Sequence, residues 1–264
     1  MPAWRLLKLE THTASVNMAV DEAVLRARID DRVPNTLRFY RWKPSAVSIG
    51  KFQKVENEVQ LANCRKYGVD VVRRISGGGT VYHDFRDEIT YSVVIRTEDL
   101  KTADITAVYT KVYAGIAEAL RILGITADFS QGDGRNCPNL TVRGRKISGS
   151  AQSHKSGIVL QHGTLLLDVD LEKMFTLLRV PWANTCMEVV NVAKRKITSI
   201  RDELEKTVSA EEVNNAMVAG FGHALNVEIV PCQLTHFELE LANRLCKEKY
   251  STDDWNFNGK SSLA

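Results

Sequence analysis

Two β-rich runs, Ile147–Gln152 and Ile158–Leu167, are separated by only five residues, and this short connection constrains the fold more than any other feature. A connection of that length joins antiparallel neighbours, because a parallel pair needs a crossover of a dozen or more residues. Elsewhere along the chain, strand-like and helix-like segments alternate. The pattern therefore predicts an α/β (α+β) fold, a mixed β-sheet flanked by helices and not a doubly wound parallel sheet.

The expected helices are marked by apolar residues at helical spacing and by capping residues at their starts. Ser15–Arg28 is expected to be helical with Ser15 or Asn17 as its cap, and Ser209–Leu225 with Ser209 as its cap. Further helices are expected at Val55–Tyr67, Ile105–Leu123, Leu171–Leu178 and Leu239–Tyr250. Further strands are expected at Thr36–Tyr40 and Ala46–Ile49, which a turn would join, and at Val69–Ile75, Ile89–Ile95 and Leu140–Val142.

Length, charge and cysteine usage exclude several classes of protein. The 264 residues suit one domain, which we expect over residues 1–257, followed by a disordered polar tail over 258–264. The 35 basic residues are nearly balanced by 32 acidic ones, so no nucleic-acid partner is expected. No apolar stretch approaches the ~18 residues of a membrane span, and the N-terminus lacks a signal-peptide core, so we expect a cytoplasmic protein without a membrane partner. The five cysteines are widely spaced and form no CxxC pair, which disfavours a disulfide framework or a zinc site.

The strongest local motif is Arg73–Asp84, RRISGGGTVYHD, in which three glycines follow a predicted strand. Glycines carry no Cβ and so let backbone N–H groups approach a ligand closely, and Arg74 places a positive charge beside them. The motif matches neither the Walker A pattern nor the dinucleotide fingerprint. Two interpretations remain open at this point: an anion-binding loop, or a tight turn in which the glycines only relieve strain.

A second motif, Gly144–Gln152, reads GRKISGSAQ and places Lys146 at the start of a strand beside small residues. Small side chains leave room for a ligand against the backbone, and a lysine there can polarise a carbonyl oxygen or neutralise a phosphate. A lysine at a hairpin is otherwise an ordinary surface charge. The isolated His162 that follows is, by itself, more often a packed residue than a catalyst.

Taken together and in order, RRISGGGTVYHD, GRKISGSAQ and QHGTLLLDVD closely resemble the lipoate-protein ligase A family, which shares a fold superfamily with biotin ligases and octanoyltransferases. Matching segments extend roughly from Trp4 to Phe257. The resemblance implies the biotin/lipoate-ligase catalytic fold and an ATP-dependent reaction with Mg²⁺, in which lipoate becomes lipoyl-AMP. The lipoyl group would then pass to a lysine of a lipoyl carrier domain, in a 2-oxoacid dehydrogenase E2 component or the glycine-cleavage H protein.

The resemblance also assigns residues. Lys146 would be catalytic, and no side chain is expected as a metal ligand. The residues expected to bind substrate or nucleotide are Arg74, Gly77, Gly78, Gly79, Thr80, Val81, Tyr82, Asn139, Ser148, Gly149, Ser150 and His162. His83 and Asp84 also fall at family-typical positions, and the apolar tunnel for the acyl chain is expected to draw on Val47, Ile49 and Val72.

Two departures from the ligase pattern qualify this assignment. In Arg135–Leu140, RNCPNL, the family's usual aspartate position holds Asn139, which brings no charge to a metal or phosphate. The sequence also stops soon after Phe257, where many ligases continue into an accessory domain. We therefore expect the form that lacks this domain and, if it is a ligase, a separate accessory subunit.

An alternative within the superfamily is an octanoyltransferase, which moves octanoyl from an acyl carrier protein through a cysteine thioester and without ATP. Cys137 lies nine residues before Lys146 and would be the nucleophile. The loop around it is shorter than such transferases carry, and Gly79 stands where they tend to hold an arginine, so the ligase is the main prediction. A non-catalytic relative that only binds lipoate is the third possibility.

Overall fold

The structure, a computed structural model, describes residues 2–132, 137–183, 185–261 and 263. Its main element is an eight-stranded sheet with the strand order β11-β1-β2-β6-β10-β9-β8-β7. The strands of this sheet are β1 (Ala3–His12), β2 (Thr36–Trp42), β6 (Glu88–Arg96), β7 (Asp128–Ser130), β8 (Asn139–Val142), β9 (Arg145–Lys155), β10 (Ile158–Leu166) and β11 (Glu228–Cys232).

This sheet is mixed, as the sequence predicts. β1 runs parallel to both β11 and β2, whereas every other neighbouring pair is antiparallel. The short connection between β9 and β10 closes a hairpin in which Ile158 lies opposite Lys155.

A second sheet of three strands packs beside the first and has the order β4-β3-β5. Its strands are β3 (Ala46–Ile49), β4 (Asp70–Arg73) and β5 (Val81–His83). The expected strand–turn–strand over residues 36–49 is therefore wrong as a hairpin. Both strands form, but β2 and β3 belong to different sheets, because β2 pairs with β1 and β6 and not with β3.

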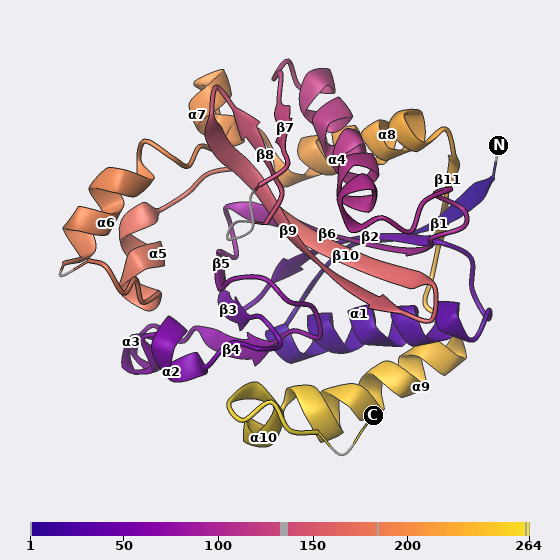
Figure 1. The fold of residues 1–264 in the computed structure, drawn as a ribbon, viewed down its shortest axis with the longest axis horizontal. Helices are drawn as coiled ribbons and strands as arrows, with labels where there is room; N and C mark the ends of the chain where they lie inside the picture. Colours follow the sequence, from indigo (N-terminus) through magenta and orange to yellow (C-terminus); the bar gives the residue numbers. More distant parts are fainter. Residues whose placement is uncertain (1, 133–136, 184, 262, 264) are drawn as a thin grey trace.

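Helices cover both faces of the large sheet (Figure 1). The longer helices α4 (Ile105–Ile122) and α8 (Ala210–Leu225) pack on one face, and α1 (Ala14–Ile29) lies on the other with α9 (His236–Leu245) outside it. The shorter helices are α2 (Val55–Glu58), α3 (Leu61–Lys66), α5 (Leu171–Leu177), α6 (Cys186–Ala193), α7 (Ile200–Leu204), the π-helix Cys246–Tyr250 and α10 (Asp253–Asn256).

Several helix boundaries differ from prediction for local reasons. α1 is capped by Thr13 and not by Ser15 or Asn17, since the Thr13 hydroxyl accepts the N–H of Val16. The single helix expected over 55–67 is two helices, because Val59 takes an extended conformation between them and pairs with Leu178. The last predicted helix begins earlier, at His236, behind a Thr235–Glu238 capping box. The Ser209 cap of α8 is confirmed.

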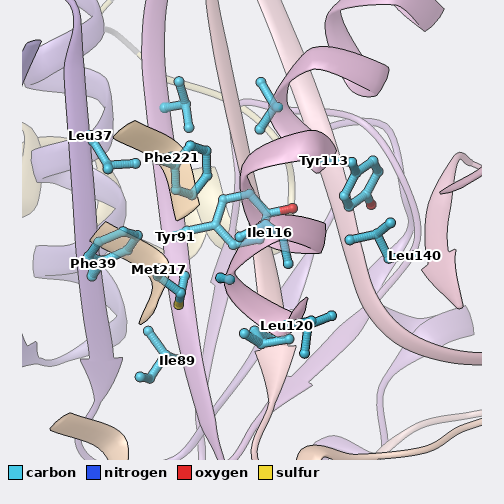
Figure 2. Packing of buried hydrophobic residues seen from close by; sticks show 14 of the residues in the cluster. Leu37, Phe39, Ile89, Tyr91, Tyr113, Ile116, Leu120, Leu140, Met217 and Phe221 are labelled. Carbon is cyan, nitrogen blue, oxygen red and sulfur yellow. The ribbon is translucent and has the colours of Figure 1, made fainter. Parts of the chain in front are cut away.

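Three apolar cores result from these layers. The largest lies between the large sheet and the α4–α8 pair, where Tyr91 and Phe39 of the sheet meet Ile116 and Phe221 of the helices (Figure 2). A second core fills the space between the opposite face of the sheet and α1, and a third lies under the small sheet. The two sheets meet along a seam, and the second core continues across it, since it includes Tyr40 of β2 together with Ala46 of β3 and Val72 of β4.

The prediction of a separate tail after residue 257 stays a prediction. Gly259 and Lys260 donate backbone hydrogen bonds to the carbonyls of Trp255 and Asp254, which ties the start of that segment to α10. In the described part of the chain, no helix is both long and apolar enough to cross a membrane.

The close crossing of α4 and α8 makes the fold sensitive to a larger residue at Gly220. A Cβ added at Gly220 would lie 2.5 Å from the carbonyl oxygen of Gly115 and 2.6 Å from the amide nitrogen of Ala119. Gly220→Ala must separate the helices, and we expect it to lower the free energy of unfolding by about 1–3 kcal/mol in urea titrations. Gly222→Ala is the matched control, because its Cβ would meet nothing closer than 3.5 Å. Equal stability of the two variants would contradict this description of the crossing.

Candidate active site

A cavity of about 150 Å³ opens at the seam between the two sheets. Its apolar wall comes from Met18 of α1, Tyr40 and Trp42 of β2, Val81 of β5 and Ala151 of β9. The polar residues that line it are Ser48, Arg74, Thr80, His83, Thr90, Cys137, Lys146, Ser150, His162 and Thr164. An apolar floor with charged groups at one side suits a ligand that has an apolar chain and a reactive polar end.

Arg74 is buried at this seam and is fully occupied by hydrogen bonds. Its Nε donates to the hydroxyl of Ser76, and its Nη1 donates to the carbonyl and the hydroxyl of Ser48. Its Nη2 donates to the carbonyls of Gly77 and Gly79, at 2.8 and 2.9 Å. All five N–H groups of the guanidinium are therefore satisfied by neutral oxygens of the chain itself. Burial lowers the pKa of Arg74 to about 10, so it stays charged at neutral pH.

Each of the two serines that contact Arg74 is also hydrogen-bonded to a histidine, and that histidine is hydrogen-bonded to a carboxylate. We call each of these hydrogen-bonded chains a relay. In the Asp21 relay, the Ser76 hydroxyl lies 2.6 Å from His162 Nε2, and His162 Nδ1 lies 2.9 Å from Asp21 Oδ2. In the Glu88 relay, the Ser48 hydroxyl lies 2.8 Å from His83 Nε2, and His83 Nδ1 lies 2.7 Å from Glu88 Oε1.

The Asp21 relay is anchored in α1 and is completely buried. Asp21 also accepts hydrogen bonds from Arg38 and Tyr40. Burial raises the pKa of Asp21, but the hydrogen bond from His162 and the charge of Arg38 outweigh it, so the pKa lies below its usual value. Burial lowers the pKa of His162, and the nearby charge of Arg74 lowers it further against the opposing effect of Asp21.

Lys146 and Cys137 both line the cavity and lie close enough to interact electrostatically. The Lys146 side chain keeps solvent contact, but its ammonium lies over Gly149: a Cβ there would be 2.6 Å from Lys146 Nζ. Burial by surrounding atoms lowers the pKa of Lys146, and attraction to Cys137 opposes this decrease. A Cβ added at Gly78 would lie 4.0 Å from the Cys137 sulfur and 3.5 Å from Arg74 Nη2. The thiol therefore lies close to two cations and to the glycine loop.

Arg73, next to Arg74, fixes the underside of the site. Its guanidinium donates to the carbonyls of Gly50, Lys51 and Gln53 and to those of Trp255 and Phe257. The loop held in this way touches the glycine loop, because a Cβ added at Gly50 would lie 2.2 Å from the carbonyl oxygen of Gly78. The C-terminal segment is thus part of the support of the site.

The structure brings together most of the residues assigned from sequence. The cavity wall includes Arg74, Gly78, Gly79, Thr80, Val81, Cys137, Lys146, Gly149, Ser150 and His162. Four others do not reach it: Gly77, Tyr82, Asn139 and Ser148. Tyr82 instead donates to Asp84, and Asn139 donates to the carbonyl of Cys137. Arg135 and Asn136 of the motif before Leu140 lie outside the described residues.

The predicted tunnel residues Val47, Ile49 and Val72 are wrong. Successive side chains of a strand point to opposite faces, and Ser48 is the β3 residue that faces the cavity. Val47 and Ile49 consequently point into the core under the small sheet, and Val72 packs in the core beside α1.

Sequence reasoning missed Met18, Trp42, Asp21 and Glu88. One signal was present for Asp21, because its spacing from Met18 and Val24 places a charge on the apolar side of the helix. Glu88 offered no signal, since its role depends on the imidazole of His83 and on the hydroxyl of Thr90, which also donates to it.

A family model described as the lipoyl protein ligase A/B catalytic domain matches residues 13–222. The chain belongs to this family. Within it, octanoyltransferase LipM of Brevibacillus brevis is 34% identical, over 97% of this chain and 99% of LipM.

Solved structures of the same family superpose over nearly the whole chain. A bi-partite lipoate protein ligase of Thermoplasma acidophilum, solved in a study that included its E2 lipoyl domain, has a TM-score of 0.87 at 29% identity and full coverage of both chains. A lipoate-protein ligase A bound with ATP has a TM-score of 0.84 at 30% identity, over 97% of this chain and 99% of that one. The resemblance to the lipoate-protein ligase A family, the predicted catalytic-domain fold and the prediction of an enzyme are confirmed.

The buried His162 predicts a pH dependence of stability. The unfolded chain takes up a proton at this histidine near pH 6.5, whereas the native chain does so only at lower pH. The stabilising contribution is therefore complete above pH 6.5 and is lost as pH falls from there towards the native pKa, by up to about 1.4 kcal/mol per pH unit. In denaturant titrations, His162→Gln should have a flatter slope in this window than the wild type. The same slope in both proteins would contradict the burial of a neutral His162.

Proposed function

We propose that the protein is an octanoyltransferase that carries the acyl group on Cys137. The observation that carries this proposal is the position of the thiol, beside Arg74 and Lys146 at the mouth of an apolar cavity. Negative charge that develops on the sulfur is attracted by both cations. The similarity to LipM over nearly the full length of both chains supports the same assignment.

The chemistry needs two acyl transfers and no energy source. The Cys137 thiolate attacks the carbonyl of an octanoyl thioester, such as that of an acyl carrier protein, and the donor thiolate leaves and takes up a proton. The neutral amine of a carrier-domain lysine then attacks the Cys137 thioester, loses a proton and forms an amide as the Cys137 thiolate departs. Lys146 is placed to stabilise the oxyanion in both steps, and the apolar wall of Met18, Tyr40 and Trp42 suits the hydrocarbon chain.

The lysine acceptor belongs to a lipoyl carrier domain in this proposal. The T. acidophilum relative was solved in a study that included its E2 lipoyl domain, which supports a carrier of that class. E2 components and the glycine-cleavage H protein are the acceptors to test.

A lipoate ligase is the second candidate, because a ligase of the same fold binds ATP. The described residues fit a nucleotide with Mg²⁺ less well. Arg74 has no N–H group left for a phosphate, and Asn139 brings no charge and donates to a backbone carbonyl. No group of three or more His, Cys, Asp or Glu side chains that could hold a metal occurs in the described part of the chain. The proposed reaction therefore uses no ATP, Mg²⁺ or lipoyl-AMP.

The decisive assay uses purified protein and a carrier domain, and it compares octanoyl-acyl carrier protein with lipoate plus ATP as the acyl donor. We expect octanoyl transfer from octanoyl-acyl carrier protein without ATP, and Cys137→Ser should reduce it about 10³-fold or more, because serine does not supply a thiolate. Cys186→Ser is the matched control, since that cysteine is exposed and does not line the cavity.

The other outcomes identify the alternatives. Lipoylation that requires ATP and survives Cys137→Ser, with or without an accessory subunit, would establish the ligase and reject the transferase. Binding of lipoate or octanoate without any labelling of the carrier would establish a non-catalytic binder.

A second prediction tests whether the position of the Lys146 ammonium matters for the reaction. Gly149→Ala should displace the ammonium, since the new Cβ would lie 2.6 Å from both Cε and Nζ. The displaced atoms end a flexible side chain, so the melting temperature should hold while kcat falls about 10²-fold, as expected for a misplacement of about 1 Å. In a Lys146→Ala background, Gly149→Ala should cause no further loss. A further loss there would show that Gly149 acts independently of Lys146.

A further inference from the structure

Arg74 carries a full charge at the seam, yet no carboxylate among the described residues contacts it. Hydrogen bonds link it to Asp21 and Glu88, and each of these acids is separated from it by one serine and one histidine. Two relays of the same chemistry, built from different elements, thus converge on a single guanidinium. The reaction proposed above uses neither histidine.

The hydrogen-bonding capacity of each group determines which atom donates in both relays. The carboxylates of Asp21 and Glu88 can only accept, so each imidazole donates its Nδ1–H to its carboxylate. In a neutral ring Nε2 is then an acceptor, and it takes the hydroxyl proton of Ser48 or Ser76, whose oxygen accepts from Arg74.

This arrangement keeps the charge of Arg74 available to the cavity. A carboxylate in direct contact would pair with the guanidinium and cancel most of its field, because the attraction between opposite charges is strongest at the shortest separation. With a serine and an imidazole in between, the acids orient the donors of Arg74 from a distance. The Cys137 sulfur, by contrast, lies near Arg74 Nη2 across Gly78 and interacts with its charge directly.

We propose that His83 and His162 are positioning residues of the acyl transfer. As neutral Nδ1–H tautomers, they turn the oxygens of Ser48 and Ser76 towards Arg74 and hold its uncompensated charge at the reacting sulfur. The predicted effect of the two histidines on the transfer rate rests on the proposed function. Their tautomers follow from the hydrogen-bond geometry alone.

Acid conditions should break the Asp21 relay. The charged or titratable groups that face His162 are Asp21 of α1, Arg74, and His83 of β5, with Arg38 and Tyr40 of β2 acting through Asp21. A proton on Nε2 would turn that atom into a donor, displace the Ser76 hydroxyl proton and place a second cation beside Arg74. Transfer activity should therefore fall at acid pH as His162 takes up a proton, which gives the pH profile an acid limb.

The first test is independent of activity. Imidazole ¹⁵N spectra of the full-length protein, with His162→Gln and His83→Gln for assignment, should show Nδ1 protonated and Nε2 unprotonated for both rings at pH 7. His162 should remain neutral at pH 6.5, where a histidine in water is half protonated. An Nε2–H tautomer or a charged ring would overturn the proposal, whether or not the protein transfers octanoate.

The second test measures kcat and KM in the transfer assay. Glutamine can accept at the position of Nε2 and takes up no proton, so His162→Gln should keep kcat within about threefold of the wild type and lose the acid limb. His162→Phe, which cannot accept, should lower kcat about 10²-fold with an unchanged KM. Exposed His236→Gln is the matched control.

Ser76→Ala covers the case in which His162→Phe does not fold. It removes the hydroxyl and should lower kcat about tenfold at unchanged KM, whereas Ser153→Ala, on β9 outside the cavity, should have no effect. Full activity of Ser76→Ala, or a folded His162→Gln as inactive as His162→Phe, would overturn the positioning role. If the wild type transfers no octanoate, the proposed function fails, and the ¹⁵N result still decides the tautomers.

Discussion

The architecture of the site depends on the burial of one guanidinium. Removing a charge from water is costly unless every donor finds a partner, and Arg74 meets this requirement with oxygens from β3, from Ser76 and from the glycine loop. The loop therefore takes its shape from Arg74, because the carbonyls of Gly77 and Gly79 must turn towards it. The small sheet is held against the large one by the same contacts, through Ser48 on one side and through Ser76 and His162 on the other.

The hydrogen bonds of Arg74 change how the glycine motif beside it is interpreted. The sequence left open an anion-binding loop or a strain-relieving turn, with Arg74 as a direct ligand in the first case. In the structure Arg74 binds the loop itself, so its influence on a ligand is through its electric field and not through a hydrogen bond. Lys146 is different, since it makes no ion pair within the described ranges and remains close to Cys137.

The mixed sheet could be predicted from the sequence because the β9–β10 connection is too short for a parallel pair. The position of Lys146 over Gly149 was likewise foreseeable, since small residues in a strand leave room for a long side chain. The direction in which β3 faces was not predicted, although Val47 and Ile49 alternate with the small Ala46 and Ser48, because a strand of four residues offers too few positions to decide which face meets the core. Asp21 and Glu88 were missed because their partners lie on other elements, and Asp21 is 141 residues from His162.

Arg73 ties this seam to the other end of the polypeptide. Its hydrogen bonds to Trp255 and Phe257 span 182 and 184 residues, and the indole of Trp255 donates in return to the carbonyl of Arg73. A ribosome makes these partners long after β3 and β4, so a nascent chain can build both sheets while the Gly50–Gln53 loop still lacks the contacts that fix it. Assembly of the reactive centre is therefore delayed until residue 257 has been made, and a chain that stopped before it would lack the support of the site.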